Sequence, residues 1–320
     1  MAGFASSVQE KEGETVLDLA LMIEGQDGLN WTRWRRLAEA AEDLGYAGLY
    51  RSDHFINSTG PHKDALELWA SLTWLAEHTQ RIDFGQLVSP VSFRNPVILT
   101  STAIAVDNLS GGRLHLGIGA GWQEREHRMF GFELLDMTHR FVRFREGVEV
   151  AHLLLHSDEP VNYGGSFYRL EDALLLPRPE RPGGPPIVIG GSGRNKTLPL
   201  AADYADEWNA NFLPADRFAE LNTYLDDLLD QRGRSRTAVR RTLMTRIIFA
   251  QNDAELKRRL EGQDEQALRD RGIIAGTPNQ IIDALGKLND AGVQRVMAQW
   301  LDQDDLGGIE AMASTVLSQL

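Results

Sequence analysis

The sequence predicts an α/β fold, a (β/α)8 TIM barrel with an insertion segment before its fifth strand. Two observations predict it. The 320 residues contain eight apolar runs, each followed by a polar or glycine-containing turn and a helical pattern, and this alternation indicates parallel strands with right-handed crossovers. The first run ends in Glu24-Gly25-Gln26-Asp27-Gly28, which lacks the glycine spacing of an open dinucleotide-binding sheet. A closed barrel carries its active site at the carboxyl ends of its strands.

The first half of the chain contains four of these units. Apolar runs predict strands at residues 16–24, 47–55, 82–88 and 113–118. Helical spacing predicts a first helix capped by Asn30 and ended by Gly45, and further helices at about 65–78, 96–109, 123–127 and 140–155. Residues 1–14 have the composition of a loose acidic tail, so we expect a single domain from 15 to 320.

Residues 157–186 interrupt the alternation, because they are rich in proline and glycine and contain one extended piece at about 167–176. We expect this segment to be an insertion and a candidate lid. The alternation then resumes, with strands expected at 187–189, 207–212, 243–250 and 296–301 and helices at about 196–205, 215–231 and 278–290. A last helix closes the chain.

The turn after the fifth strand has the residues of a phosphate site. The apolar run 187–189 leads into Gly190, Gly191, Ser192 and Gly193, and a helix with Asn195 as its N-cap is expected to follow. Glycines let a ligand approach the backbone, and a helix start offers free N–H groups and a partial positive charge. The alternative is a tight turn that needs glycines for its geometry alone.

Barrel geometry converts the strand assignments into candidate site residues. Those at the expected carboxyl ends are Glu24, Asp53, His54, Gln86, Ser89, Gly119, Gly121, Trp122, Gly190 to Gly193, Trp208, Asn209, Gln299 and Trp300. His54 can donate or accept a proton near neutral pH, the alternative being a histidine that is only hydrogen-bonded under a loop. Glu24 is a second candidate acid or base, unless it pairs with an arginine such as Arg51.

Most of the tryptophans fall into two groups. Those after strand ends could wall a planar cofactor, whereas those on helices are expected to pack in the core. The first group is Trp122, Trp208 and Trp300, and the second is Trp34, Trp69 and Trp74. The eight histidines lack the spacing of zinc ligands, so no metal is expected.

The composition restricts the partners. A net charge of −13 argues against nucleic acid. The absence of cysteine excludes disulfides and thiolate chemistry. No window approaches the ~18 apolar residues of a membrane span, and the start lacks the pattern of a signal peptide. We therefore expect a cytoplasmic protein with no nucleic-acid or membrane partner. We also expect a small-molecule substrate and a homodimer.

Three ordered motifs resemble the bacterial luciferase-like superfamily and, more narrowly, its deazaflavin (coenzyme F-420)-dependent oxidoreductases. They are Gly48-Leu49-Tyr50-Arg51-Ser52-Asp53-His54-Phe55, then Ser110-Gly111-Gly112-Arg113-Leu114-His115-Leu116-Gly117-Ile118-Gly119-Ala120-Gly121-Trp122, then Ile189-Gly190-Gly191-Ser192-Gly193 with Ala205-Asp206-Glu207-Trp208-Asn209. The resemblance extends from about residue 16 to 301. It is specific for the superfamily and less so for the cofactor, because flavin mononucleotide (FMN) occupies the same pocket in this family.

The resemblance implies roles for individual residues. The glycine turn matches the segment that holds the cofactor's phosphate, and His54 matches the histidine that assists hydride transfer beside the deazaflavin ring. A bulge with a cis non-proline peptide is implied near Gln86-Leu87. Further cofactor contacts are expected from the strand-end residues Asp53, Ser89, Gly121 and Trp122.

One departure bears on the substrate. The sugar-phosphate dehydrogenases of this family have a glutamate acid where this chain has Trp122. Their substrate chemistry is therefore not carried over. Glu124 or Glu126, in the helix that follows, could take the place of that acid.

The sequence thus predicts a hydride-transferring oxidoreductase that uses coenzyme F-420. The first alternative is an FMN-dependent luciferase-like monooxygenase. The second is a non-catalytic flavin-binding barrel, which would be favoured if His54 and Glu24 were buried and paired away from the pocket.

Overall fold

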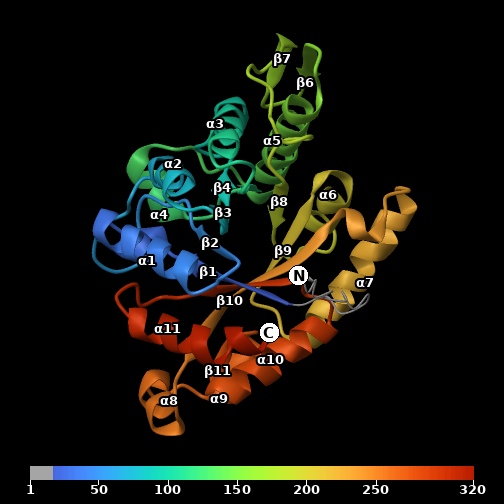
Figure 1. Cartoon of the computed structure of the whole chain (residues 1–320). Coiled ribbons are helices and arrows are strands. Elements are labelled where there is room, and N and C mark those ends of the chain that lie inside the picture. The colour runs from blue at the N-terminus through green and yellow to red at the C-terminus, as the bar shows by residue number, and fades with distance from the viewer. Residues whose placement is uncertain (1–16) are drawn as a thin grey trace, which may run out of the picture.

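In the computed structural model, which describes residues 17–320, eight parallel strands close into a barrel (Figure 1). Around the ring, each strand pairs with the next and the last with the first. The strands in that order are β1 (Asp18–Ile23), β2 (Gly48–Arg51), β3 (Asp83–Gln86), β5 (Leu114–Gly119), β8 (Ile187–Gly190), β9 (Glu207–Asn211), β10 (Arg240–Phe249) and β12 (Arg295–Gln299). The predicted barrel is confirmed. The predicted tail, 1–14, lies outside the described residues.

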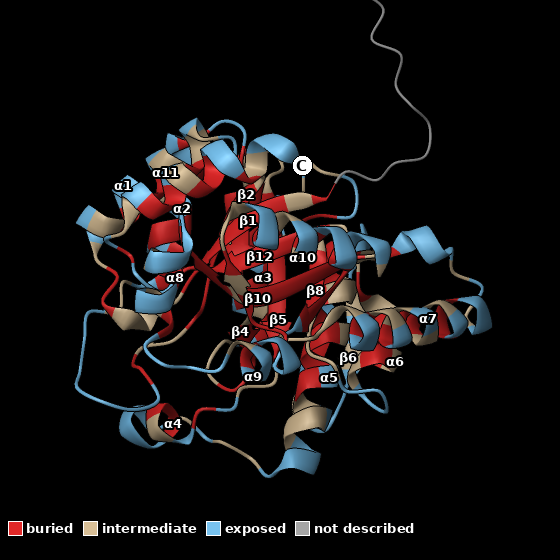
Figure 2. Cartoon of the chain, turned by 90° about the horizontal axis from the view of Figure 1, so that it is seen from below, coloured by how far each residue is buried: buried red, intermediate tan, exposed pale blue. Residues whose placement is uncertain are grey.

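Helices surround the ring. They are α1 (Trp31–Asp43), α2 (Leu68–His78), α3 (Pro96–Leu109), α4 (Glu124–Phe130), α5 (Met137–His156), α6 (Thr197–Tyr204), α7 (Ala215–Gln231), α8 (Asp253–Leu260), α9 (Glu265–Asp270), α10 (Pro278–Asp290) and α11 (Leu306–Thr315). Figure 2 shows buried strands enclosed by helices whose outer faces are exposed. The main apolar core therefore lies between the ring and its helices.

Several helix ends lie where local chemistry predicts them. The Asn30 side chain accepts a hydrogen bond from the Arg33 N–H at the start of α1, as predicted. The bounds of α3, α7 and α10 coincide with the predicted ranges. The predicted Asn195 cap is wrong, because α6 begins at Thr197 and its N-cap residue, Lys196, makes no side-chain capping bond.

Two short strands of the barrel sheet and two short helices were not predicted. β4 (Ser89–Pro90) pairs with β5, and β11 (Ile274–Gly276) extends the sheet beside β10. Helices α8 and α9 fill the connection between β10 and β11. Strands of two or three residues carry too few positions for a periodicity to be recognised.

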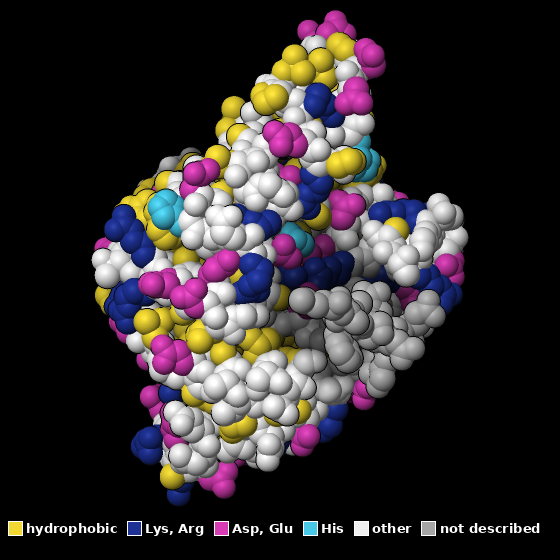
Figure 3. Space-filling view, in the orientation of Figure 1, with side chains coloured by type: hydrophobic (Ala, Val, Ile, Leu, Met, Phe, Trp, Pro, Cys, Tyr) yellow, Lys and Arg dark blue, Asp and Glu magenta, His cyan; other side chains and the backbone are white. Residues whose placement is uncertain are grey.

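The insertion between α5 and β8 contains an antiparallel hairpin, β6 (Val161–Gly164) and β7 (Arg169–Ala173). The buried carboxylate of Glu146, on α5, accepts hydrogen bonds from the backbone N–H groups of Ser166 (2.7 Å) and Phe167 (2.8 Å). These bonds attach the hairpin turn to α5. The hairpin projects from the barrel beyond the end of α5, and Figure 3 shows acidic side chains gathered at its tip.

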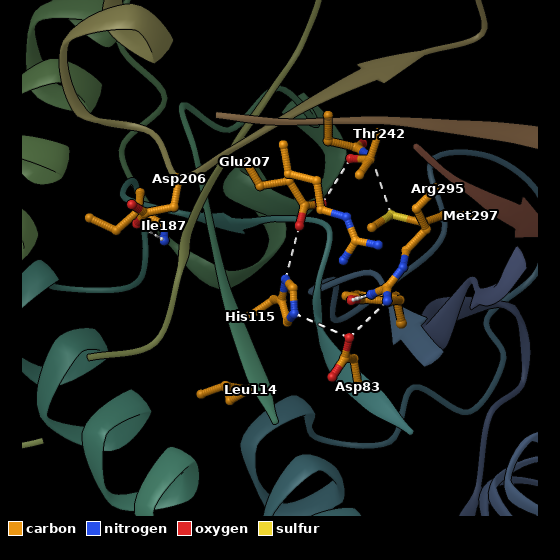
Figure 4. A network of polar contacts seen from close by, with 12 residues as sticks. Asp83, Leu114, His115, Ile187, Asp206, Glu207, Thr242, Arg295 and Met297 are labelled. Atoms are coloured by element: carbon orange, nitrogen blue, oxygen red, sulfur yellow. Dashed lines mark hydrogen bonds and ion pairs between the residues drawn. The ribbon is translucent and has the colours of Figure 1, made fainter. Parts of the chain in front are cut away.

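A buried ionic network fills the barrel interior at the amino ends of the strands (Figure 4). His115 Nδ1 lies 2.9 Å from a Glu207 carboxylate oxygen, and its Nε2 lies 3.6 Å from Asp83. Arg295 donates to Asp83 at 2.8 Å and to the Tyr50 hydroxyl at 2.7 Å. Burial by itself lowers the pKa of His115, but the hydrogen bonds and charges of Asp83 and Glu207 outweigh burial and raise that pKa above its ordinary value. Charged residues at the starts of strands thus pair with one another inside the barrel.

Candidate active site

A cavity of about 670 Å³ opens at the carboxyl ends of the barrel strands. Six of the predicted site residues line it: Glu24, His54, Leu87, Gly121, Trp122 and Gly190. Its lining also includes Gly119, Asn209 and Gln299, which barrel geometry had placed at strand ends. No lining residue comes from 157–186, all of which the structure describes, and the lid function of that segment stays a prediction.

His54 follows β2 and faces the cavity with one edge of its ring. Its Nδ1 lies 2.9 Å from a carboxylate oxygen of Glu126, a residue of α4 that is fully buried. Its Nε2 has no hydrogen-bond partner among the described residues. Burial lowers the pKa of His54, but the hydrogen bond and charge of Glu126, with smaller contributions from Glu24 and Asp53, raise it above its ordinary value overall.

Glu24 lies directly after β1, also in the cavity wall. Gln26 donates to one of its carboxylate oxygens at 2.7 Å and Gln299 to the other at 2.5 Å. The alternative partner, Arg51, is turned away: it donates to Ser71 Oγ and to the Leu66 carbonyl, and burial lowers its pKa to about 10. Glu24 is therefore held by two amides rather than by a cation.

The predicted bulge after β3 is present. The cis non-proline peptide lies at Leu87–Val88, one position beyond the implied Gln86-Leu87. The bulge comes so close to β5 and β8 that a Cβ at Gly119 would lie 2.2 Å from the Val88 side chain, and one at Gly190 would lie 3.3 Å from it. A side chain at Gly119 would thus collide with the Val88 side chain, and one at Gly190 would crowd it.

Three residues that were predicted to contact the cofactor lie behind the bulge that follows β3. The Asp53 carboxylate accepts hydrogen bonds from Ser89 Oγ at 2.6 Å and from the Arg94 guanidinium at 2.8 and 3.0 Å. Gln86 is buried and donates to the Gly117 carbonyl at 3.1 Å. Asp53, Gln86 and Ser89 are not among the cavity-lining residues, and this network holds the bulge in place.

Some of the backbone N–H and C=O groups of the glycine turn after β8 already have hydrogen-bond partners. The Gly191 N–H donates to the Asn209 carbonyl, and the Gly193 carbonyl accepts from Thr197 and Leu198. Ser192 Oγ is buried and has no hydrogen-bond partner among residues 17–320, and Gly191, Ser192 and Gly193 are not among the residues that line the cavity. A buried, unpartnered hydroxyl beside the start of α6 fits a turn that receives an acceptor such as a phosphate oxygen.

The tryptophans after strand ends separate into two kinds. Trp122 is 60% exposed, lines the cavity and meets the His54 ring edge-on, with ring centroids 5.7 Å apart. Trp208 and Trp300 are buried, and the expectation that they wall a cofactor is wrong. Trp208 stacks on Phe218 of α7, and Trp300 packs against Gly308 of α11, because both side chains point outward from the ring. Trp34 and Trp69 are in the core, as predicted.

Two arginines that the sequence did not single out line the cavity. Arg246 is on β10, and Arg271 is in the connection between α9 and β11. Neither makes an ion pair with a described carboxylate. Burial and the positive charge of Arg271 lower the pKa of Arg246. Arg246 was missed because it lies inside a long strand, whereas the candidate residues were chosen from the predicted strand ends.

No group of three or more histidine, aspartate or glutamate side chains in residues 17–320 is arranged to hold a metal ion. The same residues include no helix that is long and apolar enough to cross a membrane.

The model of the luciferase-like monooxygenase family matches residues 20–267. The chain belongs to this family. Among curated relatives of this luciferase-like protein, an F420-dependent glucose-6-phosphate dehydrogenase of Amycolatopsis mediterranei (strain U-32) is 34% identical over 180 residues, which are 55% of this chain and 51% of that protein. A 4-hydroxyprotoasukamycin monooxygenase of Streptomyces nodosus subsp. asukaensis is 33% identical over 181 residues, 56% of this chain and 47% of that protein. The chain thus spans about half the length of these curated relatives.

Among solved structures, an F420-dependent secondary alcohol dehydrogenase in complex with an F420–acetone adduct superposes with a TM-score of 0.81 at 16% identity, over 94% of this chain and 98% of the other. At this identity the likeness concerns the fold. The barrel fold of this chain is therefore shared with that F420-dependent alcohol dehydrogenase.

Proposed function

We propose that this luciferase-like protein is an oxidoreductase that binds coenzyme F420 and transfers a hydride between it and a small organic substrate. The observation that carries the proposal is the cavity. In it, His54, bound to the buried carboxylate of Glu126, lies beside the bulge at Leu87–Val88, a feature that the resemblance to the deazaflavin branch implied. Curated relatives named as F420-dependent dehydrogenases support it. When bound, the deazaflavin supplies a ring carbon that gives or takes a hydride.

Residues of this chain fit such a cofactor. The Ser192 hydroxyl and the backbone of the Gly190–Gly193 turn would hold its phosphate, which accounts for the unpartnered Ser192 Oγ. The wall formed by Leu87 and Val88, with the glycines packed against it, would support a planar ring, and Trp122 borders the same space.

His54 and Glu24 would handle the proton that accompanies hydride transfer. Because Nδ1 of His54 is bound to Glu126, Nε2 is the atom that can meet a substrate hydroxyl or carbonyl oxygen. The raised pKa of His54 increases the protonated fraction near neutral pH, so the ring can donate to an oxygen that gains negative charge. Glu24, kept in place by Gln26 and Gln299, is a second proton acceptor in the same cavity.

The substrate is proposed to carry an anionic group. Arg246 and Arg271 bring two cations, neither paired with a carboxylate of residues 17–320, into a cavity that is also lined by the acidic residues Glu24, Asp27 and Glu126. Paired guanidinium groups suit carboxylates and phosphates. The relative named as a glucose-6-phosphate dehydrogenase has a substrate of this kind. Trp122 in place of the acid of such enzymes adds an apolar surface beside His54.

The two alternatives have less support. A non-catalytic barrel would require His54 and Glu24 to point away from the cavity, and both line it. One of the relatives is named as a monooxygenase, with no cofactor in its name, whereas several are named as F420-dependent dehydrogenases. Titration of the protein with oxidised deazaflavin and with FMN tests the choice. Tighter binding of FMN, with oxygen uptake driven by NAD(P)H, would contradict the proposal.

We also propose a homodimer that buries the outer face of α3. This face presents Ile98, Ser101, Ala105 and Leu109 to solvent and no charged side chain, in a chain with 25% charged residues. Ile98 is 67% exposed and Leu109 is 45% exposed. Apolar exposure of this kind on a helix is typical of association surfaces. Sedimentation of the Leu109→Glu variant as a monomer would support it. The cytoplasmic location stays a prediction.

A further inference from the structure

Glu126 differs from every other carboxylate near the cavity in its surroundings. Its side chain is fully buried, and the one ion pair it makes with a described residue is with His54. One oxygen contacts His54 Nδ1 at 2.9 Å, and the other accepts the backbone N–H of Phe55 at 2.5 Å. A buried carboxylate is strongly disfavoured unless donors satisfy it, and here both oxygens are satisfied by the residue pair at the end of β2.

The start of α4 also binds two further positions of the connection that follows β2. Gln123 donates to the Ile56 carbonyl at 2.7 Å, and Arg125 donates to the Gly60 carbonyl at 3.1 Å. Residues 54–60 form no helix or strand, so their positions depend on contacts of this kind. Trp122, two residues before α4, contacts the His54 ring edge-on.

We propose that Glu126 is a positioning residue that fixes the orientation and tautomer of His54, and that it is not a substitute for the acid that Trp122 replaces. A carboxylate can only accept hydrogen bonds, so Nδ1 must carry a hydrogen and Nε2 must be the atom that titrates. An acid that acts on a substrate needs an oxygen free to reach it, and both oxygens of Glu126 are in use. The inference rests on the proposed function for its effect on turnover only.

The charged groups that face His54 come from three elements. Glu126 belongs to α4, Glu24 follows β1, and Asp53 precedes His54 in the chain. Asp53 is neutralised by the Arg94 guanidinium, and Glu24 makes no hydrogen bond to the histidine. Glu126 is therefore the group whose removal should change the titration of His54 most.

The first test uses the cofactor-free protein. Nitrogen-15 NMR of histidine-labelled wild type, recorded above the pKa of His54, should show the neutral ring protonated at Nδ1, which is the minor form of free imidazole. In Glu126→Gln, the amide retains the shape of the side chain and one acceptor but loses the charge. The pKa of His54 should then fall by about one unit or more, a typical effect of removing an adjacent opposite charge. Glu124→Gln, two residues earlier and exposed, should leave it unchanged.

The second test uses the protein loaded with deazaflavin and turning over a substrate. In Glu126→Gln the pH profile of kcat should shift toward acid with the NMR titration, and kcat should fall by roughly 10- to 100-fold while KM changes little. A neutral His54 protonated at Nε2 in the wild type, or an unchanged His54 pKa in a folded Glu126→Gln protein, would overturn the proposal. If Glu126→Gln does not fold, the wild-type tautomer decides alone. Failure to bind deazaflavin would refute the proposed function and leave the NMR result standing.

Discussion

Replacing Ser192 by alanine should separate cofactor binding from stability, because the two are expected to change in opposite directions. Ser192 Oγ is buried and finds no partner in the part of the chain that the structure describes, so the free protein carries the cost of an unsatisfied hydroxyl. Leaving such a group unpaired costs about 1–3 kcal/mol. Ser192→Ala is thus expected to leave the cofactor-free protein as stable as the wild type or more stable, by up to about 1 kcal/mol because the small cavity offsets part of the gain.

The same change should weaken deazaflavin binding. A hydrogen bond from a hydroxyl to a charged phosphate contributes about 1.5–3 kcal/mol, which corresponds to a roughly 10- to 150-fold rise in Kd. Fluorescence titration gives the Kd, and urea unfolding of the cofactor-free protein gives the stability. Ser314→Ala, on the exposed surface of α11, is the matched control and should change neither. A less stable Ser192→Ala protein with an unchanged Kd would refute the assignment of the turn to the phosphate.

Three further predictions concern other sites. His54→Ala should lower single-turnover hydride transfer by ~10²–10⁴-fold without changing deazaflavin affinity, whereas a purely structural histidine would show a lower Tm and a normal rate. Arg271→Met should raise KM for an anionic substrate by about tenfold or more at nearly constant kcat, and an equal effect on an uncharged substrate analogue would contradict it. In the ionic network, folding raises the pKa of His115. Protonated His115 therefore stabilises the fold fully at a pH below the pKa of the unfolded chain, and this stabilisation is lost as the pH rises through the pKa of the folded protein. Urea unfolding should therefore show His115→Asn to be less stable than the wild type by about 3 kcal/mol near pH 6, with a smaller difference at alkaline pH; a constant difference would exclude this linkage.

The barrel could be predicted from sequence because each unit repeats the same local chemistry. Asn95 and Pro96 mark the start of α3 and Pro278 that of α10, and uninterrupted apolar runs mark strands buried on both faces. Helices α8 and α9 have the N-cap residues Asn252 and Asp264, but these helices and the strand β11 are too short for a repeating pattern to be recognised. The end of β10 was predicted well, but its start was missed, since Arg240 and Arg241 are polar residues that face ionic partners at the amino end of the barrel.

The site residues that lie at the carboxyl ends of strands could be predicted from the sequence. Barrel geometry brings His54 and Glu24 into one cavity without any knowledge of loops. It does not say which way a side chain points when the strand bends, and Asp53 turned out to hold the bulge through Arg94, 41 residues away. The partnership of His54 with Glu126 joins residues 72 apart, and a charged helix start is too common for sequence alone to single it out.

The central claim is hydride transfer through a deazaflavin, and one measurement tests it most directly. The protein is mixed with oxidised coenzyme F420 and a panel of phosphorylated and carboxylated alcohols, and cofactor absorbance and dissolved oxygen are followed together. Absorbance of the oxidised cofactor should be lost with at least one anionic alcohol, without oxygen uptake, and at a rate that falls in His54→Ala. No reduction of bound coenzyme F420 by any member of the panel, together with substrate-dependent oxygen uptake by the protein loaded with reduced FMN, would contradict it.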